Sequence, residues 1–419
     1  MPRSLRVDKK YMPQVKSALR NKGYSRQIDL AADLDCSLTT VSSFLNGRAV
    51  DRQYFMAICK ILGQDCQKIA ALEDSSEGDE TEASIYVKRP ELEERCYQEL
   101  LKPGAVLRVK APKRLGKTSL IMRVIQQLEQ EQDYRGAYLP FGLADKTELK
   151  DLDKLLKWFC VSAGQALGLD NELNTYWDEK YSTSKMNCTN YFEAYLLTQL
   201  SDSPVVLCLD DVDLVFPYQE VAQDFLEMLR AWHEKSKISK IWKRLRLVLV
   251  HSTDVYIRLD TNASPFNVGL TIGLPKLTLE QVEDLINQHN LELEQEQLEK
   301  LTNLVGGHPY LLHEALNHLK NNKTSSLEQL LAEATTEAGI YSSHLRSYWS
   351  IIRQNYELAN ALKTLVKSNQ PVELKPKLKQ FDYLYCLGLA DFKGNEVKIS
   401  CNLYKEYFKE RIDGILEST

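Results

Sequence analysis

The chain has 419 residues, of which 43% are hydrophobic and 26% charged, and its formal net charge is −5. This composition is ordinary for a globular protein of two to four domains that can bury a sizeable core. No run of about eighteen apolar residues and no signal-peptide pattern occurs, so the sequence supports neither a membrane span nor secretion. The nine cysteines form no Cys-x-x-Cys pair, which predicts reduced thiols in a cytoplasmic protein.

The first 72 residues are basic, and they are predicted to form an all-α domain of short helices. Helical spacing of apolar residues covers 15–19, 26–34 and 38–45, and a short break at 35–37 separates the last two. A helix, a three-residue turn and a second helix are typical of a helix-turn-helix domain. Residues 73–84 are acidic, without a basic residue, and are predicted to be a linker.

The apolar pattern that ends in Phe44-Leu45-Asn46-Gly47 resembles the phage-repressor type of helix-turn-helix. The resemblance implies that the second helix contacts DNA bases and that two arginines contact phosphates. The implied residues are Thr39, Thr40, Ser42, Ser43, Arg48 and Arg52. Short hydroxyl side chains discriminate poorly between bases, so docking of a partner protein by the same bundle is an equal alternative.

Residues 107–121 read as an apolar strand, a tight polar loop and an amphipathic helix. The segment Ala111-Pro-Lys-Arg-Leu-Gly116-Lys117-Thr118 matches the P-loop pattern, except that Ala111 replaces the first glycine. Backbone N–H groups and a helix N-terminus at such a loop bind phosphate, so we predict ATP or ADP with Mg²⁺ as cofactors. The predicted phosphate contacts are Lys113, Arg114, Leu115, Gly116, Lys117, Thr118 and Ser119, and Thr118 is also a predicted Mg²⁺ ligand.

A second motif supports the first. Residues 204–213 form a buried-type strand that ends in carboxylates, as in a Walker B motif. Asp210 is predicted to hold Mg²⁺ and Asp211 to orient the attacking water. The strand at 244–250 ends at a polar triplet in which Ser252 or Thr253 fits a γ-phosphate sensor. Arg258 is either an arginine finger or a solvated surface residue.

Two further segments resemble nucleotide contacts of the STAND class, the signal-transducing ATPases with numerous domains. Residues 85–93 resemble the segment that packs on adenine, which implies roles for Val87 and Arg89; a plain helix cap explains the same residues. The turn at 306–309 resembles the lid motif that contacts nucleotide through Pro309. The predicted domains are an ATPase core with a parallel sheet over 85–275, a helical lid over 276–335 and a winged helix over 336–419.

The winged helix is predicted from helices near 343–366 and 374–380, followed by strands at 383–391 and 396–400 around a Gly-Asn turn. Such a domain binds DNA or clamps the lid, and the absence of a basic bias favours the clamp.

Residues 85–415 together resemble the AAA-like family that accompanies ternary conflict systems and STAND regulators in bacteria, many of them cyanobacterial. Residues 1–72 resemble the N-terminal helix-turn-helix of proteins associated with MoxR and von Willebrand A partners. The resemblance implies an ATP-dependent switch in signalling or antiviral defence. Two departures, Ala111 and the short Asp211 in place of glutamate, predict tight binding with slow hydrolysis.

Two other functions fit the same motifs. One is a DNA-loading ATPase of the initiator or transposition-regulator type, which would form rings through Arg258. The other is a transcription regulator in which the ATPase part is a sensor. The protein partners, the DNA site and the oligomeric state, including a nucleotide-dependent homo-oligomer, are left open by the sequence.

Overall fold

The computed structural model describes residues 4–7, 11–22, 24, 30, 33–34, 38–47, 50–64, 66–69, 85–200, 203–252, 268–322, 326–368, 370–373 and 379–416. The chain divides into two compact units, Met1–Ala83 and Ser84–Thr419. In the described residues, no helix is long and apolar enough to cross a membrane.

In its described residues, the first unit is a small helical bundle with one short strand pair. Its helices are α1 (Met12–Asn21), α3 (Leu38–Leu45), α4 (Arg52–Leu62) and α5 (Cys66–Ile69). Strand β1 (Ser4–Leu5) pairs antiparallel with β2 (Val50–Asp51), which the sequence did not predict. Phe44 and Phe55 are fully buried, and their ring centroids lie 5.1 Å apart. The predicted helix 38–45 is confirmed, whereas most of the predicted helix 26–34 lies outside the described residues.

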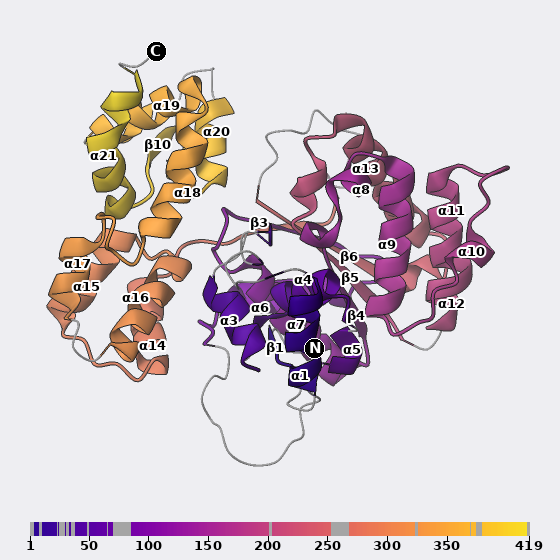
Figure 1. Cartoon of the computed structure of the whole chain (residues 1–419). Helices are drawn as coiled ribbons and strands as arrows, with labels where there is room; N and C mark the ends of the chain where they lie inside the picture. Colours follow the sequence, from indigo (N-terminus) through magenta and orange to yellow (C-terminus); the bar gives the residue numbers. More distant parts are fainter. Residues whose placement is uncertain are drawn as a thin grey trace. The chain divides into compact units, whose positions relative to one another are not determined.

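The second unit is built on a five-stranded parallel sheet (Figure 1). Its strands are β3 (Val106–Lys110), β4 (Arg135–Pro140), β5 (Val205–Asp210), β6 (Leu245–His251) and β7 (Leu270–Gly273). The order across the sheet is β4-β5-β6-β3-β7, so the first strand lies between the last two. In open parallel sheets, ligands bind outside the carboxyl ends of the strands, where the strand order reverses. The predicted parallel sheet is confirmed, and its carboxyl edge beside β3 is the place to look for a site.

Helices cover both faces of this sheet, because nearly every residue of β5 and β6 is apolar and buried. The helices α6 (Pro90–Leu101) and α7 (Lys117–Gln132) pack on one face. The other face is covered by α9 (Leu152–Ala166), α11 (Ser184–Asn190) and α13 (Gln219–Ser236), together with the π-helical turn η3 (Tyr191–Leu196). Shorter elements complete this region: η2 (Phe141–Leu143), α8 (Lys146–Leu149), α10 (Leu173–Tyr176), α12 (Leu197–Gln199), η4 (Val212–Val215) and η5 (Trp242–Arg244).

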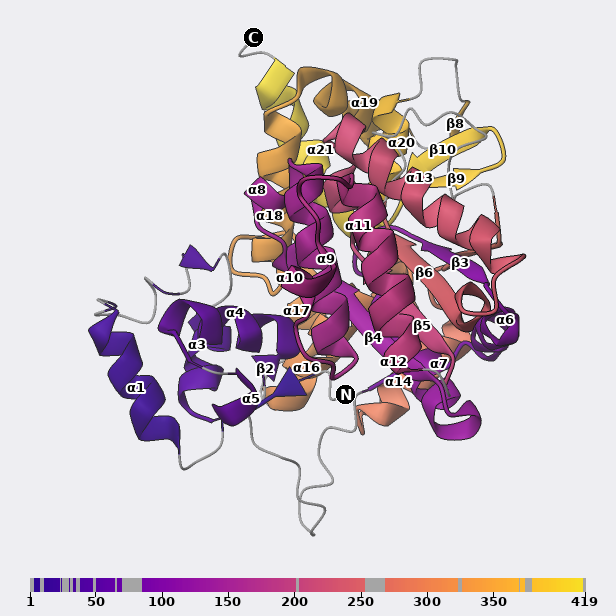
Figure 2. The ribbon, with the colours of Figure 1, turned by 90° about the vertical axis from the view of Figure 1, so that its right-hand side faces the viewer.

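The rest of the second unit is mainly helical and has one continuous apolar core. Its helices are α14 (Leu279–Gln288), α15 (Gln295–Val305), α16 (Pro309–Asn321), α17 (Leu327–Glu333), α18 (Ser342–Arg353), α19 (Tyr356–Lys367), α20 (Lys379–Cys386) and α21 (Asn402–Leu416). The strands β8 (Val372–Glu373), β9 (Ala390–Lys393) and β10 (Glu396–Ile399) form a small antiparallel sheet in the order β8-β10-β9 (Figure 2).

The predicted strand 383–391 is wrong over its first half. Residues up to Cys386 belong to α20, and β9 begins only at Ala390. Gly388 has φ of +81° and its N–H donates to the Tyr385 carbonyl, so this glycine ends a helix instead of interrupting a strand. The predicted helix 343–366 is also two helices, since the Asn355 side chain accepts from the Leu358 N–H and caps α19. Residues 374–378 lie outside the described residues.

Candidate functional site

The loop between β3 and α7 has the backbone geometry of an anion-binding turn. Gly116 has φ of +91° and precedes the first turn of α7, and apart from its own chain neighbours no described atom lies within 4 Å of the position that a Cβ would take there. This leaves the backbone open to close approach by a ligand. Ala111, the departure from the expected motif, is fully buried, and its N–H donates to the His251 carbonyl at 3.4 Å.

Lys117 lies at the centre of the predicted site. Its ammonium donates to the carbonyls of Ala111 (2.9 Å) and Pro112 (3.1 Å) and to the Ser252 hydroxyl (2.9 Å). Burial lowers the pKa of Lys117, and the nearby carboxylates of the β5 end oppose that shift. The structure thus brings the P-loop lysine and the predicted sensor serine together, although 135 positions separate them in the sequence.

Asp210 receives hydrogen bonds on both carboxylate oxygens. The Thr118 hydroxyl donates to Oδ2 at 2.6 Å, and the Tyr138 hydroxyl donates to the same oxygen at 2.8 Å. The Asp211 N–H donates to Oδ1 at 3.0 Å. The two predicted metal ligands, Thr118 and Asp210, are therefore in direct contact. Tyr138 was not predicted, since no motif marks it.

Two more carboxylates, those of Asp211 and Asp213, follow Asp210, and the pKa of each is raised. Burial and the neighbouring Asp210 raise the pKa of Asp211 to about 6, and burial also raises the pKa of Asp213. Asp213 accepts a hydrogen bond from the Ser252 N–H at 3.1 Å and so orients the predicted sensor. Asp213 is the last residue of the segment 204–213, for which only Asp210 and Asp211 had predicted roles; the spacing of the three carboxylates was the available signal.

Arg89 connects the P-loop to the segment between β7 and α14. Its guanidinium donates to the Pro275 carbonyl at 2.7 Å and to the Leu115 carbonyl at 3.3 Å, and the residue is only 8% exposed. Val87 packs instead against the apolar core formed by the helices α14 to α21. The structure therefore places Arg89, but not Val87, against the phosphate-binding loop.

Arg114 belongs to the loop between β3 and α7, and its side chain reaches the C-terminal helices. Its backbone has φ of +64°, and its Nη1 lies 2.9 Å from the His344 Nδ1 of α18. The guanidinium also lies 4.1 Å from the ring centroid of Tyr310, which directly follows Pro309, the first residue of α16. His344 in turn lies 2.8 Å from the Tyr404 hydroxyl. The P-loop is thus joined to both α16 and α18 through one side chain.

The remaining predicted residues lie on the loop, on α7 or α3, or outside the described residues. Lys113 is exposed on the loop, Leu115 is buried and Ser119 is half-buried on α7. Thr253, Arg258 and Arg48 lie outside the described residues, as do the side chains of Thr39 and Arg52. The other predicted DNA contacts, Thr40, Ser42 and Ser43, are half-buried on α3. Asn46 donates to the Ser42 hydroxyl at 3.3 Å.

Comparison with known proteins agrees with this geometry. The model of a family described as AAA-like domain matches residues 75–410. The chain belongs to the AAA-like family. Among curated proteins, none matches this AAA-like chain.

Solved structures share the AAA-like fold at low sequence identity. The Walker-type ATPase PABY2304 of Pyrococcus abyssi matches with a TM-score of 0.57 and 12% identity, over 80% of this chain and 99% of that one. The ORC2 protein of Aeropyrum pernix, solved as ADPNP-ADP complexes, matches with a TM-score of 0.50 and 15% identity, over 81% and 97%. A STAND protein of Pyrococcus horikoshii with a tetratricopeptide repeat sensor matches over 78% of this chain and 43% of that one, with a TM-score of 0.31 and 15% identity, too low to carry an argument.

The donor set of the AAA-like site fits Mg²⁺ bound together with a phosphate ligand. Mg²⁺ prefers oxygen ligands and is usually held by one or two protein groups plus substrate phosphates and water. Thr118 and Asp210 supply a hydroxyl and a carboxylate in contact with each other. Within the described residues, no group of three or more His, Cys, Asp or Glu side chains could hold a metal by itself. The site is therefore suited to a metal that arrives with its nucleotide.

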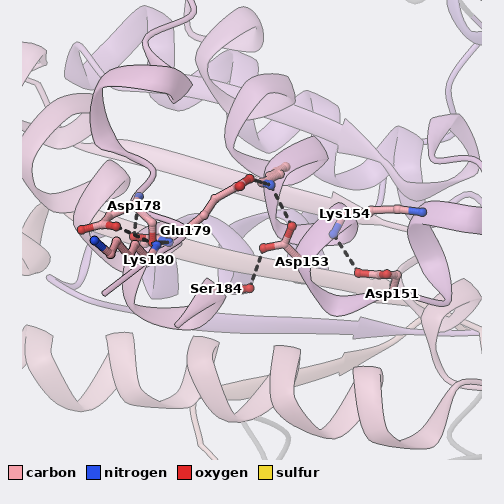
Figure 3. Close-up of polar contacts among 9 residues, drawn as sticks. Asp151, Asp153, Lys154, Asp178, Glu179, Lys180 and Ser184 are labelled. Carbon is pink, nitrogen blue, oxygen red and sulfur yellow. Dashed lines mark hydrogen bonds and ion pairs between the residues drawn. The ribbon is translucent and has the colours of Figure 1, made fainter. Parts of the chain in front are cut away.

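A pocket of about 630 Å³ lies elsewhere, between α9, α11 and residues 177–185. Its polar groups contact one another (Figure 3). Asp153 accepts from Ser184 at 2.6 Å, and Lys157 lies 2.8 Å from both Asp153 and Glu179. Lys185 is likewise paired with Asp224. Because these charges satisfy one another, nothing in the pocket requires a ligand.

Proposed function

We propose that this AAA-like protein binds ATP and ADP with Mg²⁺ and uses the exchange or slow hydrolysis of ATP to change the contacts of its lid and C-terminal helices. In this proposal it is a STAND-like switch. The observation that carries it is Arg114: a residue of the phosphate-binding loop contacts both His344 and Tyr310. A ligand that recruits the guanidinium to its phosphates would withdraw it from these partners, so nucleotide state and domain contacts are coupled.

The proposed roles of the site residues follow from their positions. Lys117, which now donates to two loop carbonyls and Ser252, would donate to the phosphates. Thr118 and Asp210 would hold Mg²⁺, which supplies charge neutralisation of the phosphates when bound. Asp211, whose pKa is about 6, is mainly ionised at neutral pH and can accept a proton from water. Ser252 is held by Asp213 through its N–H.

Other contacts would hold the lid and the C-terminal helices against the ATPase core. Lys276 donates to the Asp391 carboxylate at 2.6 Å and to the Ser400 carbonyl at 2.5 Å, which joins the segment after β7 to β9 and β10. Gln288 of α14 exchanges hydrogen bonds with the backbone of Tyr86. A Cβ at Gly388 would lie 3.5 Å from the Pro112 Cβ, so the turn before β9 lies against the P-loop. These contacts support the C-terminal region as a clamp on the core.

The switch predicts different exposure of α18 and α20 in different nucleotide states. We would measure ATP turnover and amide hydrogen exchange of the full chain without nucleotide, with ADP and with ATP. The wild type should turn ATP over slowly and change protection in α18 and α20 between states. Arg114→Ala should bind nucleotide and lose most of this difference. Arg346→Ala is the matched control, because Arg346 lies on α18 but pairs with Glu337.

Two results would refute the switch. One is nucleotide binding with the same protection in all states, and the other is an Arg114→Ala variant that responds as the wild type does. If the wild type binds no nucleotide, the binding function itself is refuted.

We propose that the output of the switch is made by the first unit, either on DNA or on a protein partner such as a MoxR or von Willebrand A protein. Salt dependence separates these outputs. DNA contact through Arg48 and Arg52 predicts that the double alanine variant of the full chain loses about two units of the log–log salt slope of DNA binding. A DNA-loading ATPase would instead form rings or filaments in ATP, and Arg258→Ala would abolish them.

A further inference from the structure

Tyr138 is a residue of the site that no motif identifies. It lies on β4, which pairs in parallel with β5, and the register places Tyr138 opposite Cys208, two residues before Asp210. Residues two apart on a strand share one face, so the Tyr138 side chain reaches along the sheet toward the Asp210 carboxylate. Its ring packs on the apolar cluster between the sheet and α7, the helix that carries Thr118.

The phenol and the Thr118 hydroxyl donate to the same oxygen. Asp210 Oδ2 accepts from Thr118 at 2.6 Å and from Tyr138 at 2.8 Å. A packing role alone needs only a phenylalanine here, since the ring would make the same apolar contacts. Burial and the adjacent Asp210 raise the pKa of Tyr138, so the hydroxyl keeps its proton and remains a donor throughout the physiological pH range.

We propose that Tyr138 is a positioning residue: its hydroxyl fixes the orientation of the Asp210 carboxylate and thereby adjusts the affinity of the site for Mg²⁺ with ATP. The inference rests on the proposed nucleotide-binding function. Thr118 has to face both the metal and Asp210, and the Asp211 N–H reaches only the other carboxylate oxygen. Tyr138 is the donor to Oδ2 that is not itself a proposed metal ligand. Its oxygen also keeps a lone pair that can accept from water around the ion.

The test is the gain in nucleotide affinity that Mg²⁺ gives. The dissociation constant of a fluorescent ATP analogue would be measured for the full chain in Mg²⁺ and in EDTA. The value in EDTA divided by the value in Mg²⁺ gives the gain in affinity. Tyr138→Phe should reduce this ratio about tenfold, because a hydrogen bond to a charged group is lost. Affinity in EDTA should be unchanged. Tyr134→Phe is the control, since its hydroxyl donates to the Leu100 carbonyl.

A double-mutant cycle adds a readout that a structural role would not change. If Tyr138 acts through Asp210, then Tyr138→Phe should alter the ratio less than about twofold in an Asp210→Asn background. The inference is overturned if Tyr138→Phe leaves the ratio unchanged, lowers affinity equally in Mg²⁺ and EDTA, or has its full effect in the Asp210→Asn background. Absence of binding by the wild type in both conditions would instead overturn the proposed function, and the inference with it.

Discussion

Two acidic clusters of the second unit differ in how their charge is neutralised. At the end of β5, Asp210, Asp211 and Asp213 lie near the buried ammonium of Lys117, and Lys113 adds a second, exposed positive charge. Burial and Asp210 nevertheless raise the pKa of Asp211 to about 6. In the α9–α11 pocket, burial also acts to raise the pKa of Asp153, but hydrogen bonds from Lys157 and Ser184 outweigh it and the net shift is downward.

This difference in charge neutralisation distinguishes a candidate ligand site, at the end of β5, from a set of paired surface charges, in the α9–α11 pocket. Carboxylates that lose water without gaining equivalent partners destabilise the fold, and a bound cation relieves that destabilisation. Carboxylates that are already paired with lysines gain little from a ligand. The size of the α9–α11 pocket therefore says less about function than the charge imbalance at the P-loop, and the comparison can be tested residue by residue.

The largest expected effect is on nucleotide affinity. Lys117→Ala removes the ammonium at the centre of the proposed site and should weaken binding of ATP by at least about 100-fold, since charge-assisted hydrogen bonds to phosphate are strong. Lys157→Ala removes an ammonium with two carboxylate partners and should change affinity less than about twofold. Titration calorimetry measures both. Equal losses in the two variants would contradict the comparison.

The second effect is on stability and depends on pH. The folded pKa of Asp211 is about 6, against an ordinary value of 3.8, so between these pH values the folded state binds more protons and loses stability as pH rises. Asp211→Asn removes this loss. Because Asp211 is exposed, solvent screens its carboxylate, and the variant should be only about 1 to 2 kcal/mol more stable than the wild type above pH 7 and equally stable below pH 4. Denaturant unfolding across this range measures the difference, and a variant that gains stability at pH 4 as well would refute the electrostatic cause.

The third effect is the loss of stability at acid pH that His344 causes. Burial and the Arg114 charge lower the pKa of His344 from 6.5 to about 3, and Tyr310, Tyr348 and Tyr404 surround its ring. Because the unfolded chain then binds the proton more readily, stability is lost as pH falls from about 6.5 toward 3.

His344→Gln should lessen this loss by about 2 kcal/mol at pH 5, measured by denaturant unfolding at pH 7.5 and pH 5. His318→Gln on α16 is the control and should follow the wild type. A His344→Gln variant that loses stability as steeply as the wild type would show that another group carries the acid sensitivity.

The parts of the site that the sequence predicted are those in which one short pattern fixes both a strand and the residues at its end. Asp210 and Ser252 lie at the carboxyl ends of β5 and β6, and Lys117 and Thr118 begin α7 after the loop that follows β3. These three strands are parallel neighbours, so correct strand assignment was enough to bring the four residues together.

Tyr138 needed the register of β4 against β5, which no local pattern specifies. The contact between Arg114 and His344 joins residues 230 positions apart and depends on how the C-terminal helices pack. The last half of α20, residues 383–386, was mistaken for a strand because a short continuous apolar run does not distinguish a buried strand from a helix. The end of this helix depends on the positive φ of Gly388.

The smallest effect should have the opposite sign to that of Asp211→Asn. The pKa of Asp153 is lowered in the folded state, so its contribution to stability is present at neutral pH and is lost as pH falls through the folded pKa. The Lys157–Asp153 pair is partly exposed, with 30% and 43% of the two side chains accessible, and solvent screens it. Asp153→Asn should therefore cost only about 0.5 kcal/mol at pH 7 and nothing at pH 2, measured by the same unfolding experiment. If Asp153→Asn stabilises the protein at pH 7, the carboxylates of the pocket are as poorly neutralised as those of the P-loop site, and a bound cation would stabilise them as well.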